Sequence, residues 1–549
     1  MATATVTPPI AKQRAYHFLT PRKDCNKDLL AWCEEIDGRI VSINASMNDF
    51  LHYFVPGSSN PPPLQATQPF DIPLGKLEAS MYEPLVGIDR PGMYQKLTLP
   101  FFCKCIGLTK LVSDFPHDKR LCFHNSAHRV IKFPFQRFEH EFHTTKPDIV
   151  ASLPGQVFEG PFPDRWRNIS TVFEVKSAVQ GDPMEYGSLE NDEALVQLAM
   201  SARNILVSQS RLFVFVVGVY GHFARIYRFD HAGAVCSARF NYQEDPSPLR
   251  RFLWRLAHPI HENCDIIGAD PTVRLSTKAD RKNIESALRA SGIEHTAETW
   301  KTCRWTTVQK AGEQGNVRYL LYDPIFLNPG LFSRATTVWA GLEVDDNGHP
   351  SFEVESGGPP REKRVIVKDA WQQLARRPET EHYEQIYASI ALQVLRCAEA
   401  ADTRDDKAER EAVVKAWDEA WTGLAEFVAG EDLGAEELKQ DVEARVGHQT
   451  STAVYQHPTI HQLLERSHMR TVSKTIGQPI SDFKCTQEMV QVLLDAIEGT
   501  RLGHLVGMCA YLRRRLHITR SPYRFRGWNR ASRYQRRQCD DGQWPWLPS

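Results

Sequence analysis

The segment Arg364-Val-Ile-Val-Lys-Asp-Ala-Trp371 most strongly limits the folds open to the second half of this chain. Its three β-branched residues, 365–367, are followed directly by a lysine, Lys368. The segment predicts a β-strand, because valine and isoleucine favour the pleated conformation. Side chains alternate between the two faces of a strand, so Ile366 and Lys368 share one face while Val365 and Val367 share the other. A lysine at the solvent end of a strand is common, and its meaning therefore depends on the segments around it.

A glycine-bearing loop precedes this strand. It is Pro329-Gly-Leu-Phe-Ser-Arg-Ala-Thr-Thr-Val-Trp339, in which Gly330 is the only glycine. Glycine lets a backbone approach a phosphate group closely, because it has no Cβ atom. Ser333 and Ala335 stand where a phosphate-binding loop carries further glycines. Gly330, Ser333 and Ala335 are therefore candidate nucleotide contacts, with less room for phosphate than three glycines would give.

A carboxylate-rich helix follows the strand. Proline suits the first helical position, so the helix is predicted to begin at Pro378. Glu379 would then lie in the first turn, where a carboxylate interacts favourably with the helix dipole. Glu381 or Glu384, deeper in the helix, can reach Lys368, and the sequence leaves the choice between them open. A glycine loop, a strand lysine and a helix carboxylate are the parts with which a protein kinase clamps the phosphates of ATP.

Further segments follow one another between about residue 170 and about residue 500. They are Phe173-Glu-Val-Lys176, Ser210-Arg-Leu-Phe-Val-Phe215, Arg225-Ile-Tyr-Arg-Phe-Asp230, Ser333-Arg-Ala-Thr-Thr-Val-Trp339, Val367-Lys-Asp-Ala-Trp371, Gly477-Gln-Pro-Ile-Ser-Asp-Phe483 and Glu488-Met-Val-Gln-Val-Leu-Leu-Asp-Ala-Ile497. In this order they resemble the fungal-type protein kinase family. The resemblance implies a kinase fold in the second half, with Lys368 on the ATP phosphates and Gly477 near the hinge. It also implies ATP and Mg²⁺ as cofactors, and transfer of the γ-phosphoryl group to a serine or threonine hydroxyl of a protein substrate.

The end of the chain departs from that family. The family continues into a His-Arg-Asp catalytic loop and an Asp-Phe-Gly metal site, whereas this chain reads Met508-Cys-Ala-Tyr-Leu-Arg-Arg-Arg-Leu-His-Ile-Thr-Arg520 and contains neither tripeptide. Fewer than fifty residues follow Arg501, too few for the larger lobe of a kinase. Since the catalytic base and the magnesium carboxylate have no counterpart, we expect little or no phosphotransfer from the chain as written. A non-catalytic pseudokinase or scaffold is the corresponding alternative.

A second set of catalytic residue types lies in the first half. Asp148 after Pro147, followed by Glu174-Val-Lys176, matches the pattern of the PD-(D/E)xK nucleases. Two carboxylates on adjacent strands can hold Mg²⁺, and a lysine two residues after the glutamate shares its face and can position an attacking water. Gln197 lies where some of these nucleases add a glutamine. Asp148 and Glu174 are thus candidate metal ligands, with Lys176 and Gln197 beside them, in an active nuclease or in a nuclease-like scaffold.

The secondary structure around these residues is predicted to alternate between strand and helix. Strands are expected at 146–152, 170–176, 212–220 and 223–229. A helix is expected at 191–209, because Leu195, Leu198, Ala199, Ala202 and Ile205 fall on one face. The order strand, strand, helix, strand, strand suits a nuclease-like core.

The whole chain of 549 residues is too long for one ordinary core, and we expect an α+β multidomain protein. The predicted parts are a helical or irregular leader at 1–99, a nuclease-like α/β module at 100–265, a helical connector at 266–302, a kinase-like domain at 303–502 with a helical insertion at 388–465, and a disordered arginine-rich tail at 503–549. The tail holds ten arginines and no acidic residue between Tyr511 and Gln538. It is either a nucleic-acid-binding segment or the product of a shifted reading frame, and the break in the family pattern near residue 502 favours the second.

Composition gives no overall attraction to nucleic acid or membrane, because the net charge is -1. The first residues lack the apolar core of a signal peptide. The longest apolar run, Leu212 to Tyr220, is too short to span a bilayer. We therefore expect an intracellular protein of the cytoplasm or nucleus without a membrane partner. Nucleic acid remains a possible partner through the tail or the nuclease-like module.

Overall fold

The computed structural model describes the chain in several stretches, which are residues 13–15, 27–57, 61, 105–140, 145–160, 162–309, 315–353, 361–386, 425–474, 477, 484–495 and 497. Two compact units divide the chain, the first from residues 1–381 and 425–482 and the second from residues 382–424 and 483–549. Most of the predicted leader, the start of the predicted helical insertion, the segment 478–483 and the arginine-rich tail lie outside the described residues. The described part is a mixed α/β fold, compatible with the expected α+β class.

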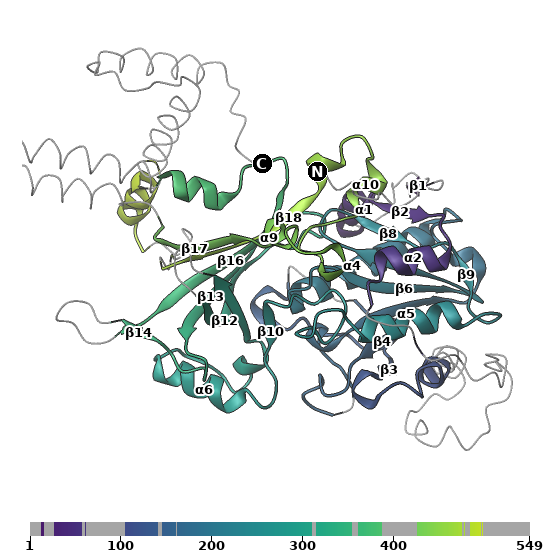
Figure 1. The fold of residues 1–549 in the computed structure, drawn as a ribbon, viewed down its shortest axis with the longest axis horizontal. Coiled ribbons are helices and arrows are strands. Elements are labelled where there is room, and N and C mark those ends of the chain that lie inside the picture. The colour runs from purple at the N-terminus through teal and green to yellow at the C-terminus, as the bar shows by residue number, and fades with distance from the viewer. Residues whose placement is uncertain are drawn as a thin grey trace, which may run out of the picture. The chain divides into compact units, whose positions relative to one another are not determined.

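Within the described residues, the first sheet holds nine strands, and Figure 1 shows its arrangement. Their order is β1 (Gln13–Ala15), β2 (Ile40–Ile43), β8 (Ala234–Cys236), β7 (Phe223–Phe229), β6 (Val214–Tyr220), β5 (Thr171–Lys176), β4 (Ile149–Ser152) and β3 (Cys122–Asn125), with β9 (Phe240–Asn241) paired to β7. The pairs β5–β6 and β2–β8 are parallel and the others antiparallel. The four strands predicted in this region are confirmed as β4, β5, β6 and β7.

The predicted leader is part of this sheet, which corrects the view of residues 1–99 as a separate helical or irregular segment. Strand β2 pairs with β8, placing Ile40 opposite Ala234. The buried guanidinium of Arg225 donates to Ser42 Oγ at 3.2 Å and to Asp182 at 2.8 Å. Strand β2 was not predicted because four residues give only a weak local pattern, and their partner strand lies almost two hundred residues further along the chain.

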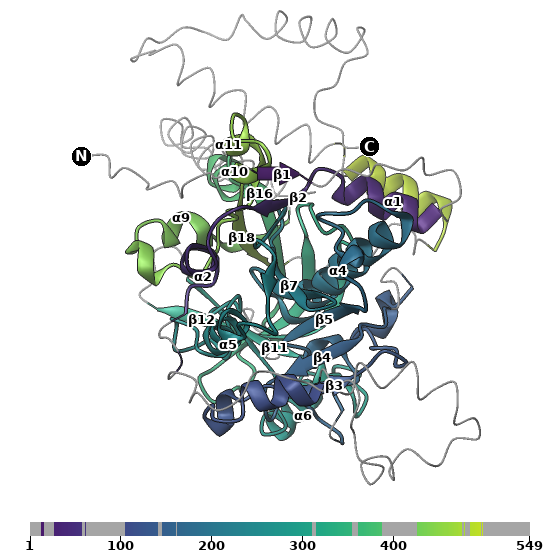
Figure 2. The same ribbon diagram turned by 90° about the vertical axis from the view of Figure 1, so that its right-hand side faces the viewer.

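Helix α4 (Leu189–Gln209) connects β5 to the parallel strand β6, as such a pair requires. Ser188 caps it by accepting the Asn191 N–H at 3.2 Å, and Ser210 ends it in a left-handed conformation with φ of 52°. The predicted face of α4 is confirmed as buried core. Its other side is covered too, since α1 (Lys27–Ile36) lies along it (Figure 2). The Arg203 guanidinium of α4 lies 4.8 Å from the centre of the Trp32 ring of α1.

The second sheet is antiparallel throughout. Its strand order is β10 (Val273–Leu275), β11 (Arg304–Gln309), β12 (Asn316–Leu327), β13 (Thr337–Val344), β16 (Arg364–Gln373), β18 (Arg466–Ser473) and β17 (Phe427–Asp432), and a separate pair joins β14 (Phe352–Glu353) to β15 (Arg361–Glu362). The strand predicted at Arg364–Trp371 is therefore confirmed as β16.

Two predicted helical regions contain strands of this sheet. Strand β17 falls within the expected helical insertion at 388–465, and its pairing with β18 corrects that expectation for residues 427–432, while short helices occur at 433–437, 453–456 and 461–464. Strand β10 falls within the expected connector at 266–302, which also holds helix α6 (Arg281–Ala290). Alanine and glutamate dominate the sequence before β17, and their helical propensity obscured a strand whose partner lies some forty residues further on.

The remaining helices are short. Among the described residues they are α2 (Met47–Phe54), α5 (Ser247–Ala257), α9 (Leu433–Glu437), α10 (Ala453–Gln456) and α11 (His461–Leu464), with 3-10 helices at His117–Lys119, Gln136–Phe138, Trp166–Asn168, Val179–Gly181, Thr299–Lys301 and Val442–Ala444. Residues 105–111 and 379–386 are helical as well. Residues 486–495 are also helical. Within the described stretches, no helix is both long and apolar enough to cross a bilayer.

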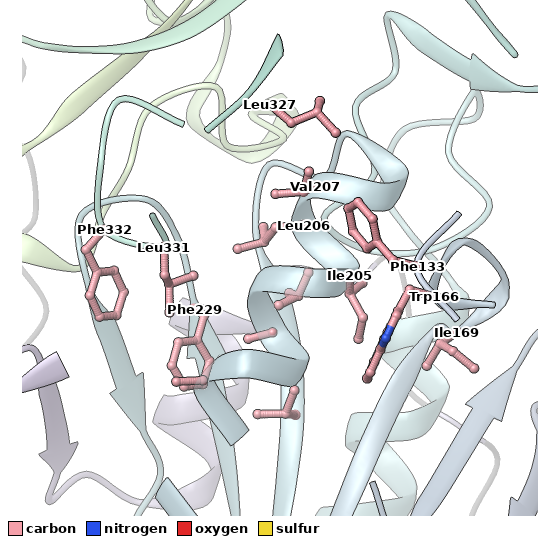
Figure 3. Packing of buried hydrophobic residues seen from close by; sticks show 14 of the residues in the cluster. Phe133, Trp166, Ile169, Ile205, Leu206, Val207, Phe229, Leu327, Leu331 and Phe332 are labelled. Carbon is pink, nitrogen blue, oxygen red and sulfur yellow. The ribbon is translucent and has the colours of Figure 1, made fainter. Parts of the chain in front are cut away.

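One hydrophobic core is shared by the two sheets. It joins residues of α4 and β7 to Trp339 of β13, to Val365 and Val367 of β16, and to the loop between β12 and β13. In Figure 3, Phe332 and Leu331 of that loop lie beside Phe229 of β7. This loop is the one predicted to contact a nucleotide, so its packing bears directly on the candidate site.

Candidate functional site

Lys368 lies in the middle of the second sheet. Strand β16 runs between β13 and β18, and Lys368 stands opposite Val338 on one neighbour and Thr471 on the other. Val365 and Val367 are buried at 3% and 0% exposure, whereas Lys368 keeps contact with solvent. The alternation predicted for this strand is confirmed, and it places the lysine on the face opposite the core.

The carboxylate that holds Lys368 is Glu379. Lys368 Nζ lies 2.8 Å from both Oε1 and Oε2 of Glu379, and the two side chains are 30% and 28% exposed. The expected partners were Glu381 and Glu384; instead Glu381 Oε2 lies 3.7 Å from Arg377 Nε, and Glu384 belongs to the second unit. The first-turn glutamate reaches the lysine because the helix begins beside β16.

A glycine sets how closely this helix approaches the sheet. A Cβ atom at Gly430 of β17 would lie 2.5 Å from Cγ2 of Thr380, the residue after Glu379. Real Cβ atoms do not come so close, so a larger residue at 430 would require the Thr380 side chain or the first turn of helix 379–386 to move. Gly430 thus helps to fix the position of Glu379 relative to Lys368.

The loop from β12 to β13 satisfies its own polar groups. Gly330 N donates to Asn328 Oδ1 at 2.8 Å, and Ala335 N donates to Ser333 Oγ at 3.0 Å. The Ser333 hydroxyl also donates to Gly330 O at 2.9 Å. Ala335 has a φ of +41°, a left-handed conformation that glycine adopts at lower cost. Gly330, Ser333 and Ala335, the expected nucleotide contacts, therefore bond to one another and to Asn328.

The same loop is anchored on the first sheet. Phe332 N donates to Glu35 Oε1 at 3.0 Å, and Arg203 Nη1 donates to Pro329 O at 3.3 Å. The Phe332 ring stacks on Phe229 at 6.4 Å between ring centres with 8° between the planes (Figure 3). Three backbone N–H groups of the loop, at residues 330, 332 and 335, are thus engaged by the protein itself.

Gly477, expected near the hinge, is exposed, and a Cβ atom there would meet nothing within 4 Å. The residues from 478 to 483 lie outside the described part of the chain. The contribution of Gly477 to a hinge therefore stays a prediction.

The structure brings together the second set of predicted residues. Strands β4 and β5 are antiparallel neighbours, and Asp148 Oδ2 accepts the Val175 N–H at 2.7 Å. Lys176 Nζ lies 2.9 Å from Glu174 Oε1. Burial raises the pKa of Asp148, and burial followed by the charge of Asp148 raises the pKa of Glu174 to about 7. Because two buried carboxylates repel each other when both are charged, binding of a proton or a cation between Asp148 and Glu174 is favourable.

Lys176 and helix α4 complete this acidic site. Burial lowers the pKa of Lys176, but the charges of Glu174, Asp148 and Glu193 together raise it. Gln197 is exposed on α4 and lies one turn after Glu193, on the same side of the helix. The structure therefore gathers Asp148, Glu174 and Lys176, and it places Gln197 on the helix face beyond Glu193.

A third group of polar residues was not predicted. Asp270, His448 and His468 are all buried, and one ligand atom from each lies within 4.8 Å of the others. They come from three distant segments, so no spacing in the sequence indicates that they meet. Glu379 is the other residue that the sequence interpretation did not choose, although its place in the first helical turn was predicted.

Comparison with known proteins adds one match. The model of the fungal protein kinase family matches residues 147–514, which is more than half of the 549 residues. No curated protein and no solved structure matches the chain. The matched segment spans β5, the β12–β13 loop, Lys368 and β18, and it includes the segments that carry the resemblance in sequence. The chain therefore belongs to the fungal protein kinase family.

Proposed function

We propose that this protein binds ATP on the outer face of the second sheet, with Lys368 on the phosphates. The observation that carries the proposal is the Lys368–Glu379 ion pair at 2.8 Å, on a strand that follows a hairpin and precedes a helix. Kinases use this order of parts, since a glutamate on the helix keeps the strand lysine extended toward the phosphates. The family membership supports the same assignment.

The neighbouring side chains suggest how the nucleotide would lie. Val338 and the exposed Phe326 stand in register with Lys368 and offer an apolar surface to the base. Arg334 Nη2 lies 3.9 Å from Glu379 Oε2 and adds a second cation near the phosphates. Because the loop N–H groups already have protein partners, we propose that these cations, rather than the loop backbone, bind phosphate. ATP would supply the γ-phosphoryl group, and Mg²⁺ would offset its negative charge.

We further propose that binding is not followed by appreciable phosphotransfer in this chain. Neither a His-Arg-Asp nor an Asp-Phe-Gly tripeptide occurs in the sequence. These motifs supply the base that accepts the hydroxyl proton and the carboxylate that holds magnesium. The protein would then act as a pseudokinase whose nucleotide supports a conformation or an interaction, instead of phosphorylating a serine or threonine.

Calorimetric titration of the full chain with ATP, with and without Mg²⁺, tests the proposal. Lys368→Met should reduce affinity at least tenfold, since it removes the cation and leaves Glu379 to repel the phosphates. Lys363→Met is the matched control, because Lys363 Nζ also lies 2.8 Å from a glutamate, Glu343, and is similarly exposed. Equal binding by wild type and Lys368→Met would refute the site. Transfer of labelled phosphate to a protein, lost in Lys368→Met, would keep the site and refute the non-catalytic part.

A specific observation favours a second candidate activity, Mg²⁺-dependent cleavage of a phosphodiester. Asp148 and Glu174 approach one another at the β4–β5 edge with raised pKa values, and Lys176 contacts Glu174 at 2.9 Å. Carboxylate oxygens are the ligands that Mg²⁺ prefers, so the donor set fits this ion. In such a site, Lys176 would hold the attacking water or stabilise charge on the phosphate.

The test is incubation of the full chain with linear DNA and RNA, with Mg²⁺ or with EDTA. Cleavage that requires Mg²⁺ and disappears in Glu174→Gln would establish the activity. Glu190→Gln is the control, because Glu190 is exposed at the start of α4 and lies outside the acidic site. If wild type and Glu174→Gln leave the nucleic acids equally intact, this activity is refuted and the module is a scaffold.

A further inference from the structure

A buried group of histidines and carboxylates lies on the face of β16 and β18 opposite Lys368, and it includes Asp369, the residue after Lys368. Asp270 precedes β10, His448 lies in the loop between the 3-10 helix Val442–Ala444 and α10, and His468 is on β18. Their exposures are 3%, 5% and 4%. All three belong to the first compact unit.

The potential ligand atoms point toward one another. His448 Nε2 lies 3.2 Å from Asp270 Oδ1, and His468 Nδ1 lies 3.8 Å from Asp270 Oδ2. Two ligand atoms on one tetrahedral zinc ion are about 3.3 Å apart, given metal–ligand bonds of about 2.0 Å. The contacts of His448 and His468 involve different oxygens of Asp270, and the three ligand atoms lie within 4.8 Å of one another, so the side chains would move inward to share one ion. Asp270 Oδ1 also accepts the Thr272 N–H at 2.8 Å and the Thr272 hydroxyl at 2.6 Å, which hold the carboxylate in place.

The outer nitrogen of each imidazole faces a carboxylate. His448 Nδ1 lies 3.7 Å from Glu437 Oε1, and His468 Nε2 lies 3.4 Å from Asp369 Oδ1. Metal-binding histidines usually direct their second nitrogen at a carboxylate, which fixes the tautomer and orients the ring. Each histidine thus has a carboxylate beside its outer nitrogen, at 3.7 Å for His448 and 3.4 Å for His468, while its inner nitrogen faces Asp270.

The inner nitrogen of His468 has no hydrogen-bond partner among the described residues. A buried polar atom without a partner is costly, and such atoms in folded proteins call for a missing water or ion. The ring cannot turn away freely, because it stacks on Trp371 with 5.0 Å between ring centres and 8° between the planes. The unpartnered atom is therefore held facing the cluster.

The surrounding charges match a divalent cation. Asp270, Asp369 and Glu437 contribute three negative charges, and Arg470 contributes one positive charge through contacts of 2.7 Å to Asp369 and 3.3 Å to Asp270. With both imidazoles neutral, as metal ligands must be, these four groups carry a net charge of -2. Without an ion, burial lowers the pKa of His448, but Asp270 and Glu437 outweigh burial and raise this pKa to about 9, so an ion bound here would displace a proton from His448. Glu431 also faces this region, and burial raises its pKa, which favours its neutral form. Arg470 holds both aspartates in position without neutralising the group.

We propose that Asp270, His448 Nε2 and His468 Nδ1 form a binding site for a divalent ion of the zinc class. Two imidazole nitrogens and one carboxylate oxygen are a common zinc donor set, and a fourth position would be left for water. The ion would join the segment before β10 to β18 and to the loop at His448. Its role would be to stabilise the first unit, independently of nucleotide binding at Lys368.

The experiment uses the full chain, depleted of metal with a chelator and then titrated with Co²⁺. One ion per chain should bind and give the visible absorption of a four-coordinate site, and Zn²⁺ should displace it. His468→Gln and His448→Gln should each weaken Co²⁺ affinity at least tenfold. His231→Gln is the matched control, because His231 is also buried and also contacts Trp371, on which His468 stacks, but it lies outside the cluster.

X-ray absorption spectroscopy of the Zn²⁺-loaded wild type identifies the ligand atoms directly, so the test does not depend on whether the variants fold. The expected first shell contains nitrogen and oxygen only, with the signature of two imidazoles. A sulfur shell would assign the ion to cysteines and overturn the proposal. If the wild type does not bind one Zn²⁺ per chain at micromolar Zn²⁺, the proposal is also overturned. The cluster is then a network of protonated histidine and carboxylates.

Discussion

Replacing Phe332 by alanine tests whether the β12–β13 loop is anchored as the structure indicates. The ring is 7% exposed, belongs to the core that both sheets share, and stacks on Phe229. Buried Phe→Ala changes cost about 3–5 kcal/mol, and an aromatic pair adds about 0.5–1.5 kcal/mol beyond area burial. Because a loop can partly close the space left behind, we expect a loss near the lower limit, about 3 kcal/mol.

Guanidinium denaturation followed by far-ultraviolet circular dichroism gives the change in the free energy of unfolding. Phe352→Ala is the control, since Phe352 is 49% exposed on β14 and should cost less than about 0.5 kcal/mol. Hydrogen exchange at the Phe332 N–H, which bonds to Glu35, should also accelerate in a variant that loosens the loop, such as Glu35→Ala. If Phe332→Ala lowers the free energy of unfolding by less than about 1 kcal/mol, the loop is not anchored as the structure indicates.

Two further predictions concern buried charges. Burial and the charge of Asp230 raise the pKa of Glu465 to about 7 from its ordinary 4.5, so the folded protein holds a proton that the unfolded chain releases. The free energy of unfolding should therefore fall by up to about 3 kcal/mol as the pH rises from 4.5 to 7. Denaturation curves of Glu465→Gln across this range should lack this fall, and a fall as large as that of the wild type would contradict the prediction. Asp182→Ala should cost about 3 kcal/mol, the lower limit for breaking a buried ion pair, because Arg225 is buried at 1% side-chain exposure and loses its 2.8 Å partner but keeps its contact with Glu185 at 2.5 Å. The double change Asp182→Leu with Arg225→Met should recover most of that loss, and strictly additive losses in a double-mutant cycle would refute the coupling.

Local patterns predicted the elements that bury a continuous apolar face. Strands β6 and β7 are fully or almost fully buried, and α4 presents a regular apolar face, so each carries a strong periodic signal in the sequence. The side chains of β16 alternate as the sequence predicted, and this alternation alone is enough to assign Lys368 to the face opposite Val365 and Val367.

Contacts between distant segments could not be predicted in the same way. Strand β2 is only four residues long, and strand β17 follows a helix-favouring sequence, so both are defined by partners elsewhere in the chain. The choice of Glu379 depends on how close the helix starts to β16, which Gly430 helps to set from another strand. The cluster of Asp270, His448 and His468 brings together three segments that are far apart in the sequence, so the sequence shows no metal-ligand spacing for it.

The most direct test of the proposed ATP site is labelling with an acyl-phosphate derivative of ATP, which acylates the lysine amine nearest the bound phosphates. After digestion, mass spectrometry identifies the modified residue, and excess ATP serves as the competitor. We predict that Lys368 is the principal labelled lysine and that ATP protects it, while Lys363 is labelled weakly and without protection. Labelling of Lys368 no stronger than that of Lys363, or unaffected by ATP, would contradict the assignment of Lys368 and Glu379 to a nucleotide-binding site.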